Sequence, residues 1–275
     1  MQTVSTHVWE DGPVVMGILN NSPDSFHEES VHHSTEAMVT EAEEMVESGA
    51  EIIDIGAESN KPDAELISSE REQRRLEPVV EAISQLDAKV SVDTWKADVA
   101  DAAVRAGTDI INDISGLDDP EMAAVAAEHD VPIVVGHSTD VLAEFGEEAE
   151  YDDVVSEVRT ELDKIADRAL AEGVSEENVI VDPGINFGKN VVDSTKLIAQ
   201  VDAFVETGYP VLVGHSRKLH YAEVNLEDGT SLPATVALTV AAVERGADIV
   251  RVHDVPENYE ALKTGEILKK LDPSL

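Results

Sequence analysis

Short apolar runs rich in β-branched residues alternate along the chain with longer segments of helical period. The apolar runs predict strands at 14–19, 51–56, 89–92, 109–113, 131–135, 178–182, 209–214 and 247–252. Helix-like segments lie between them, among them 70–86, 96–106, 153–172 and 233–245. This alternation is typical of a parallel sheet covered by helices, because such strands are buried on both faces and lose their period-two pattern.

The number and spacing of these elements predict an α/β fold, a (β/α)8 TIM barrel. Eight strand–helix units in roughly 250 residues are the usual dimensions of that barrel. A doubly wound open sheet is the structural alternative, but no G-x-G-x-x-G follows the first strand. No linker or low-complexity tract interrupts the 275 residues, so we expect a single domain over 1–275.

The charge of the chain changes the picture of its partners and its surroundings. It carries 58 Asp and Glu against 19 Lys and Arg, a formal net charge of −39. Such a surface excludes nucleic acid as an expected partner. The acidic residues are scattered among regular apolar positions, which indicates a folded protein and not an acidic disordered tail. Molar salt shortens the Debye length to about 3 Å and screens the repulsion, so we expect a halophilic protein.

The expected location is the cytoplasm, with no membrane partner. No apolar run approaches the roughly 20 residues that span a bilayer. The start of the chain, MQTVSTHVWEDG, has neither the basic nor the apolar region of a secretory signal. There is no cysteine, which excludes disulfides, thiolate nucleophiles and cysteine-bound zinc.

Polar residues follow every predicted strand, at the end of the barrel where such enzymes carry their chemistry. Single residues of this kind usually cap helices or shape turns, as for Ser59, Thr94, Ser115 and Asp254. The full set, in chain order, is Asn20, Ser22, Asp24, Ser25, Glu58, Ser59, Asn60, Lys61, Asp93, Thr94, Asn112, Asp113, His137, Ser138, Asp182, His215, Ser216, Arg217, Lys218, Arg251, His253 and Asp254.

Two groups within this set indicate a substrate. Asp93, Asn112 and Asp182 could bind a flat heterocycle with adjacent donors and acceptors, such as an aminopyrimidinone. Four basic side chains at the same end indicate a phosphate-bearing substrate. The four basic residues are Lys61, Arg217, Lys218 and Arg251. The plainer interpretation is that these cations pair with the abundant acids.

The motifs at the strand ends resemble those of the dihydropteroate synthases over residues 14–265. In the same order and spacing stand MGILNNSPDSF, GAEIIDIGAES, SVDT, NDISG, DPGINFGK, SRK and RVHD. The resemblance implies a (β/α)8 barrel, usually homodimeric. Its reaction joins a pterin methylene pyrophosphate to p-aminobenzoate, giving 7,8-dihydropteroate and pyrophosphate.

The resemblance also implies roles for individual residues. Asp93, Asn112, Asp182 and Lys218 would bind the pterin ring, and Asn20 would ligate Mg²⁺ on the pyrophosphate. Arg251 and His253 would hold the departing pyrophosphate, to which Lys61 would also contribute. Phe187, Ser216, Lys218 and Asn60 would border the p-aminobenzoate site. Asp93, Lys218 and Arg251 are the expected catalytic set.

The sequence departs from the family pattern at several positions, some of which lie on the amine side. Asn60 and Lys61 replace the usual threonine and arginine, and lysine lacks the bidentate fork of arginine. Ser138 and Asn186 also differ from the usual residues, as does His215 in the SRK segment. Two alternatives to the synthase therefore remain. One is a noncatalytic or altered-substrate pterin-binding paralogue, and the other is a barrel of the methyltetrahydrofolate:corrinoid methyltransferase type.

Overall fold

The computed structural model describes residues 7–20, 35–57, 66–139, 149–219 and 232–271. Its strands are β1 (Val14–Asn20), β2 (Ile52–Gly56), β3 (Lys89–Asp93), β4 (Ile110–Asp113), β5 (Ile133–Gly136), β6 (Val179–Asp182), β7 (Leu212–Val213) and β8 (Ile249–Val252). Its α-helices are α1 (Thr35–Glu47), α2 (Ser69–Ile83), α3 (Ala97–Ala106), α4 (Met122–His129), α5 (Val154–Ala171), α6 (Val191–Ala199), α7 (Asp202–Val205), α8 (Leu232–Glu244) and α9 (Val255–Leu271). Two short 3₁₀ helices are η1 (Val8–Asp11) and η3 (Glu176–Asn178).

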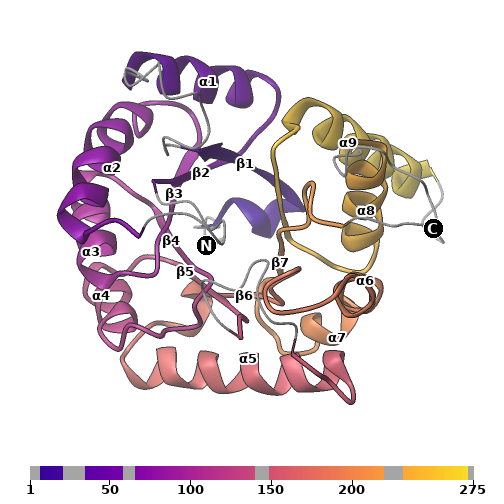
Figure 1. Cartoon of the computed structure of the whole chain (residues 1–275). Coiled ribbons are helices and arrows are strands. Elements are labelled where there is room, and N and C mark those ends of the chain that lie inside the picture. Colours follow the sequence, from indigo (N-terminus) through magenta and orange to yellow (C-terminus); the bar gives the residue numbers. More distant parts are fainter. Residues whose placement is uncertain (1–6, 21–34, 58–65, 140–148, 220–231, 272–275) are drawn as a thin grey trace, which may run out of the picture.

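The strands form one parallel sheet that closes on itself. The order is β6-β5-β4-β3-β2-β1-β8-β7. A parallel bridge between Val181 and Val211 joins the two edge strands. Figure 1 shows the helices as an outer ring around these strands. The predicted TIM barrel is confirmed, and the open-sheet alternative is wrong.

Strand β7 is shorter than the sequence predicted. The apolar run 209–214 yields a ladder over Leu212–Val213 alone. Pro210 has no amide hydrogen to donate, so it cannot continue the ladder. Its carbonyl still accepts from the amide of Val181 at 2.9 Å, which holds the two edges together.

Apolar side chains fill the inside of the barrel at its N-terminal end. The inner cluster consists of Trp9, Val14, Met16, Ile52, Ile110, Val134, Ile180, Leu212 and Ile249. Trp9 belongs to η1, the indigo segment over the centre of the ring in Figure 1, and is 5% exposed. Residues of opposite strand parity, such as Ile53 and Ile111, pack outward against the helices. The inner cluster therefore supports whatever lies above it, toward the carboxyl ends of the strands.

None of the helices in the described residues combines the length and the apolar character that a membrane crossing requires.

Candidate active site

Along four strands, the residues that point into the barrel change from apolar to polar over a step of two positions. Alternate residues of a strand point to the same face, so residues two positions beyond the apolar cluster form the next inner layer. The apolar residues are Ile52, Ile110, Ile180 and Ile249. The residues above them are Asp54, Asn112, Asp182 and Arg251. This polar layer is the floor of the barrel's C-terminal mouth.

Arg251 connects two carboxylates across this floor. Its Nε donates to Oδ2 of Asp54 at 2.5 Å, and its Nη2 donates to Oδ2 of Asp93 at 2.6 Å. Burial by itself would lower the pKa of Arg251, but the two carboxylates outweigh burial and raise it. The guanidinium is therefore a fixed positive charge in a nearly dry setting, with its side chain 15% exposed.

Asp54 is the most buried member of the floor, with no exposed surface. Its Oδ1 accepts from the hydroxyl of Ser91 at 2.6 Å, and its Oδ2 accepts from Nδ2 of Asn112 at 3.2 Å. A buried carboxylate with several donors is well satisfied. Asp54 thus orients Asn112 so that its amide nitrogen is turned to the floor.

Asp93 and Asn112 are register neighbours at the ends of β3 and β4. Asp182 lies across the mouth at the end of β6, where its Oδ1 accepts from the amide of Gly184 at 2.8 Å. Burial raises the pKa of Asp182, and the charges of Lys218, Arg251 and Lys189 oppose that rise. The three residues offer carboxylate and amide oxygens as hydrogen-bond acceptors around one opening.

Lys218 and Phe187 meet beside this group. The Nζ of Lys218 lies 4.2 Å from the centroid of the Phe187 ring and 3.3 Å from the carbonyl oxygen of Ile185. A cation over an aromatic face is held by the ring's quadrupole. Lys218 therefore connects the turn after β7 to the turn after β6, which also contains the residues that follow Asp182.

His253 and Ser216 form a second contact at the end of β8. The Ser216 hydroxyl accepts from the amide of His253 at 3.2 Å and lies 3.0 Å from its Nδ1. The hydroxyl and Nδ1 are within hydrogen-bond distance, and the tautomer of the imidazole decides which of the two donates. Burial, followed by the charges of Arg217 and Arg251, lowers the pKa of His253 to about 4. The imidazole is therefore neutral near pH 7.

Two polar residues of the SRK segment have structural partners. Arg217 binds Asp254 through Nη2 at 2.6 Å and Nε at 3.2 Å, which agrees with the plainer interpretation of that cation. His215 is 1% exposed and its Nε2 lies 2.9 Å from the Thr239 hydroxyl in α8. His215, which differs from the residue usual at this position in the family, thus anchors the segment to α8.

The structure brings most of the predicted site residues to one end of the barrel. Asn20 ends β1 and is exposed, in register with Gly56 at the end of β2. Thr94 binds Glu72 of α2, and Ser115 binds Asp113, as expected for residues that shape turns. Asn60 and Lys61 lie outside the described residues, as do Ser22, Asp24, Ser25, Glu58 and Ser59.

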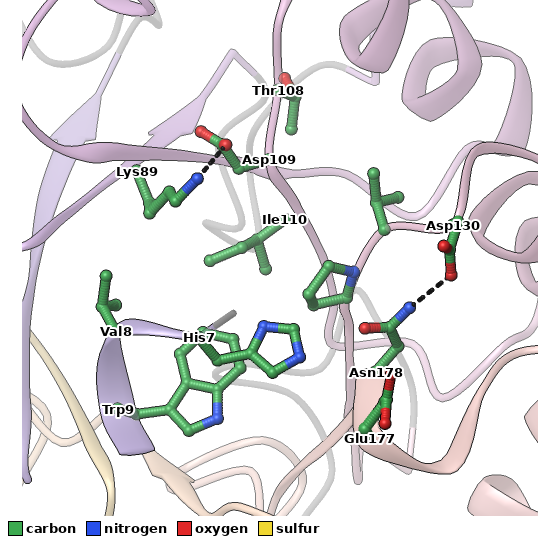
Figure 2. Close-up of a pocket in the computed structure, with 12 residues that line it drawn as sticks. His7, Val8, Trp9, Lys89, Thr108, Asp109, Ile110, Asp130, Glu177 and Asn178 are labelled. Atoms are coloured by element: carbon green, nitrogen blue, oxygen red, sulfur yellow. Dashed lines mark hydrogen bonds and ion pairs between the residues drawn. The ribbon is translucent and has the colours of Figure 1, made fainter. Parts of the chain in front are cut away.

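A separate hollow of about 330 Å³ lies at the N-terminal end of the barrel (Figure 2). The rings of His7 and Trp9 stack over it with centroids 4.7 Å apart. Lys89 pairs with Asp109 at 2.7 Å, and Asn178 donates to Asp130 at 3.1 Å (Figure 2). These polar groups pair with neighbours at the edge of the hollow, and barrel enzymes carry their chemistry at the other end. We therefore place the active site at the C-terminal mouth.

A family model described as pterin binding enzyme matches residues 16–253. The chain belongs to the pterin-binding enzyme family. The family resemblance given by the motifs is confirmed.

Relatives of this pterin-binding enzyme match it over nearly its whole length. Dihydropteroate synthase of Bacillus subtilis is 42% identical over 252 residues, which are 90% of this chain and 86% of that protein. A probable bifunctional folylpolyglutamate synthase/dihydropteroate synthase of Haloferax volcanii is 47% identical over 266 residues, 97% of this chain. The chain spans 32% of that relative, about a third of its length. A structure of Xanthomonas albilineans dihydropteroate synthase with 4-aminobenzoic acid has a TM-score of 0.84 at 38% identity, covering 94% of this chain and 93% of that one.

Sequence reasoning missed two buried residues of this pterin-binding enzyme. Asp54 lies inside the apolar run EIIDIG, and the charge within a buried strand was the available signal. Lys189 ends DPGINFGK and is 3% exposed, although lysine is almost never fully buried without partners. Both are hydrogen-bonded to residues that the motifs did single out: Asp54 to Asn112 and Arg251, and Lys189 to Phe187.

Proposed function

We propose that the chain is a dihydropteroate synthase. It would join 6-hydroxymethyl-7,8-dihydropterin pyrophosphate to p-aminobenzoate and release pyrophosphate. The observation that carries this proposal is the cluster of Asp93, Asn112 and Asp182 beside the fixed charges of Arg251 and Lys218. The similarity to proteins named dihydropteroate synthase supports it.

The pterin ring would lie on the polar floor. Its aminopyrimidinone edge presents N–H and NH₂ donors, and these match the oxygens of the three residues. A carboxylate facing such an edge makes a charge-assisted hydrogen bond, which is stronger than a neutral one. The Lys218 ammonium would donate to a ring acceptor from the side of Phe187.

In the reaction, the bond between the pterin methylene carbon and the pyrophosphate oxygen breaks. The electron pair leaves with pyrophosphate, and the arylamine nitrogen forms the new C–N bond and loses a proton. Arg251, and His253 in its Nε2–H tautomer, would stabilise the negative charge that grows on the leaving oxygen. No nucleophilic side chain is needed, which agrees with a chain that has no cysteine.

The p-aminobenzoate site would lie between the turns after β6 and β7, bordered by Phe187, Ser216 and Lys218. The Lys218 ammonium, which lies 4.2 Å from the centroid of the Phe187 ring, would pair with the carboxylate of this substrate. Asn60 would complete the border. Its amide in place of a threonine keeps hydrogen-bonding capacity there.

Mg²⁺ would bind between the substrate pyrophosphate and Asn20. Among the described residues, no group of three or more His, Cys, Asp or Glu side chains is placed to hold a metal by itself. A single exposed amide oxygen fits Mg²⁺, which keeps several waters and binds substrate phosphates with few protein ligands. When bound, the ion would neutralise charge on the leaving group.

The enzyme would be a homodimer that buries the outer face of α8. This helix has no charged residue from Leu232 to Val243, although the chain has a net charge of −39. Pro233 and Ala237 are exposed on it, and Val236 and Val240 are partly exposed. An uncharged surface helix on so acidic a protein indicates a covered face, and a second copy of the chain would cover it.

The acidic coat supports a halophilic enzyme of the cytoplasm that binds neither nucleic acid nor membranes. The repulsion within a charge of −39 is screened at molar salt. Similarity to a Haloferax volcanii protein agrees with this setting.

The test is release of pyrophosphate by the purified protein in multimolar KCl with Mg²⁺. The dihydropterin pyrophosphate is supplied with and without p-aminobenzoate. We expect release that depends on p-aminobenzoate and that falls by about 100-fold or more in Lys218→Ala and Asp93→Ala. The matched control is Lys196→Ala, an exposed lysine of α6 that pairs with Asp193.

The same assay separates the synthase from the two alternatives. Binding of the pterin by folded protein without release of pyrophosphate would support the noncatalytic or altered-substrate paralogue. Methyl transfer from methyltetrahydrofolate to a corrinoid would support the methyltransferase type.

A further inference from the structure

Lys189 places its ammonium group inside the protein, 3% exposed, within a cage of backbone oxygens. Its Nζ lies 2.9 Å from the carbonyl oxygens of His137, Gly184 and Phe187. An ammonium has three donors, so these three contacts use all of them. A buried charge is tolerated only when it is hydrogen-bonded in this way.

The three carbonyl groups belong to two strand ends that flank Asp182. His137 follows β5, while Gly184 and Phe187 lie in the turn after β6. The amide of His137 donates to the carbonyl of Asp182 at 2.9 Å, and the amide of Gly184 donates to its side chain at 2.8 Å. The ammonium therefore connects the two segments that hold Asp182 in place.

The turn after β6 has a tight shape that needs such a connection. Gly184, Asn186 and Gly188 have positive φ angles of 67°, 72° and 65°. A Cβ atom on Gly184 would lie 1.9 Å from the carbonyl oxygen of His137, so only glycine allows this approach. Asn186 replaces a glycine usual in the family, and asparagine is a residue that tolerates positive φ. The close approach gathers carbonyl oxygens that repel each other unless a cation lies between them.

The charges around the cage connect it to the substrate residues. Burial lowers the pKa of Lys189 to about 7, with Asp182 acting against this shift and Lys218 adding to it, so the group is an ammonium below pH 7. Phe187, whose carbonyl binds Lys189, carries the ring on which Lys218 rests at 4.2 Å. His137 presents only its carbonyl to the cage, and burial lowers the pKa of its ring to about 3, so the imidazole is neutral.

We propose that Lys189 is a positioning residue for both substrates. Its ammonium fixes Asp182 against the end of β5 and fixes the Phe187 ring beneath Lys218. It thereby sets the distance between the pterin side and the amine side of the site. The inference rests on the proposed synthase function, and it assigns Lys189 no contact with either substrate.

The experiment compares wild type with Lys189→Met and Lys189→Ala in pyrophosphate release, with titration calorimetry of the dihydropterin pyrophosphate as a second measurement. Lys189→Met keeps the unbranched stem of the side chain as far as Cε and removes the ammonium with its three donors. We expect at least a tenfold rise in KM for both substrates and a matching loss of pterin affinity, in protein whose circular dichroism is that of wild type. Lys196→Met, with an exposed ammonium on α6, is the matched control and should behave as wild type.

A rescue measurement separates positioning from general packing. Lys189→Ala removes a three-carbon chain and the ammonium, which propylammonium replaces and propanol replaces without the charge. We expect propylammonium to restore affinity and rate, and propanol to leave both low. If Lys189→Ala does not fold, it should recover folded, active protein only when refolded with propylammonium.

The outcomes distinguish this inference from the function on which it rests. A wild type that releases no pyrophosphate contradicts the proposed function, and the calorimetric comparison then still tests the cage. A folded Lys189→Met with both KM values and the pterin affinity within twofold of wild type overturns the inference. Equal effects of propanol and propylammonium, or no effect of either, also overturn it.

Discussion

The Nη2 atom of Arg251 donates to Oδ2 of Asp93 at 2.6 Å, although the two residues are 158 positions apart. Asp54 binds the other side of the same guanidinium. In the proposed reaction, Asp93 faces the pterin and Arg251 faces the pyrophosphate. The pair would therefore set the orientation of the two ends of one substrate, and a change at either residue should affect both.

Replacing Arg251 by lysine should separate charge from geometry. Lysine keeps the positive charge but has no planar fork, so it cannot bind Asp54 and Asp93 together. We expect kcat for pyrophosphate release to fall about 100-fold in Arg251→Lys. Arg245→Lys, at an exposed arginine of the α8 end, is the control and should keep full activity. Activity of Arg251→Lys within threefold of wild type would contradict this role.

Removing the charge of Asp54 should destabilise the protein as well as inactivate it. Asp54→Asn leaves the buried guanidinium short of one carboxylate, and breaking a buried ion pair costs about 3 kcal/mol. Denaturant unfolding at constant KCl measures the change in the free energy of unfolding. Glu206→Gln removes a surface partner of Arg159 and should cost less than about 1 kcal/mol. Equal losses of unfolding free energy in the two variants would show that the Asp54–Arg251 pair stabilises the protein no more than the surface pair does.

His215 should make stability depend on pH. Burial lowers its pKa from 6.5 to about 4. As pH falls below about 6.5, the unfolded chain takes up a proton that the folded chain does not, so stability is full above that pH. Between pH 6.5 and 4 it should fall by about 1.4 kcal/mol per pH unit from this residue.

The pH effect is measured as a difference between wild type and His215→Gln. Unfolding free energies at pH 7 and pH 5, in the same KCl concentration, give the slope of each. Asp113 titrates in this range with the opposite sign, because burial raises its pKa to about 6, but it is present in both proteins and cancels. We expect a shallower slope in His215→Gln, and parallel slopes would refute the assignment.

The Mg²⁺ concentration required for pyrophosphate release should depend on Asn20. Chelation with EDTA should abolish pyrophosphate release, and added Mg²⁺ should restore it, because the proposed ion would neutralise charge on the leaving group. Asn20→Ala should raise the Mg²⁺ concentration that gives half-maximal rate by about tenfold, with saturating Mg²⁺ recovering most of the rate. An unchanged Mg²⁺ requirement would mean that the ion has other ligands.

A charge on the outer face of α8 should break the proposed dimer. Ala237 is exposed on that helix, so Ala237→Glu should leave the fold of each copy unchanged while placing a charge in the interface. Size-exclusion chromatography with light scattering in multimolar KCl should report a dimer for wild type and a monomer for the variant. Ala171→Glu, at the exposed end of α5, is the control and should remain dimeric.

The sequence by itself determined the barrel and the end of it at which the polar strand-end residues gather. The strands can be predicted from the sequence because burial on both faces makes each of them a continuous apolar run. The same pattern places Asp93, Asn112 and Asp182 at strand ends, since the carboxyl ends of parallel strands meet at one rim. The run 209–214 was overestimated because periodicity does not register the missing amide hydrogen of Pro210.

The tertiary structure alone decided which charges pair. Asp54, Ser91 and Arg251 come from three strands, and the closure of the barrel brings them within hydrogen-bond distance. The cage of Lys189 is made of carbonyl oxygens, which every residue has, so no residue type marks it in the sequence. Partners across a barrel depend on the register and on side-chain direction in three dimensions. A one-dimensional pattern records which residues face inward, but it does not record which of them meet.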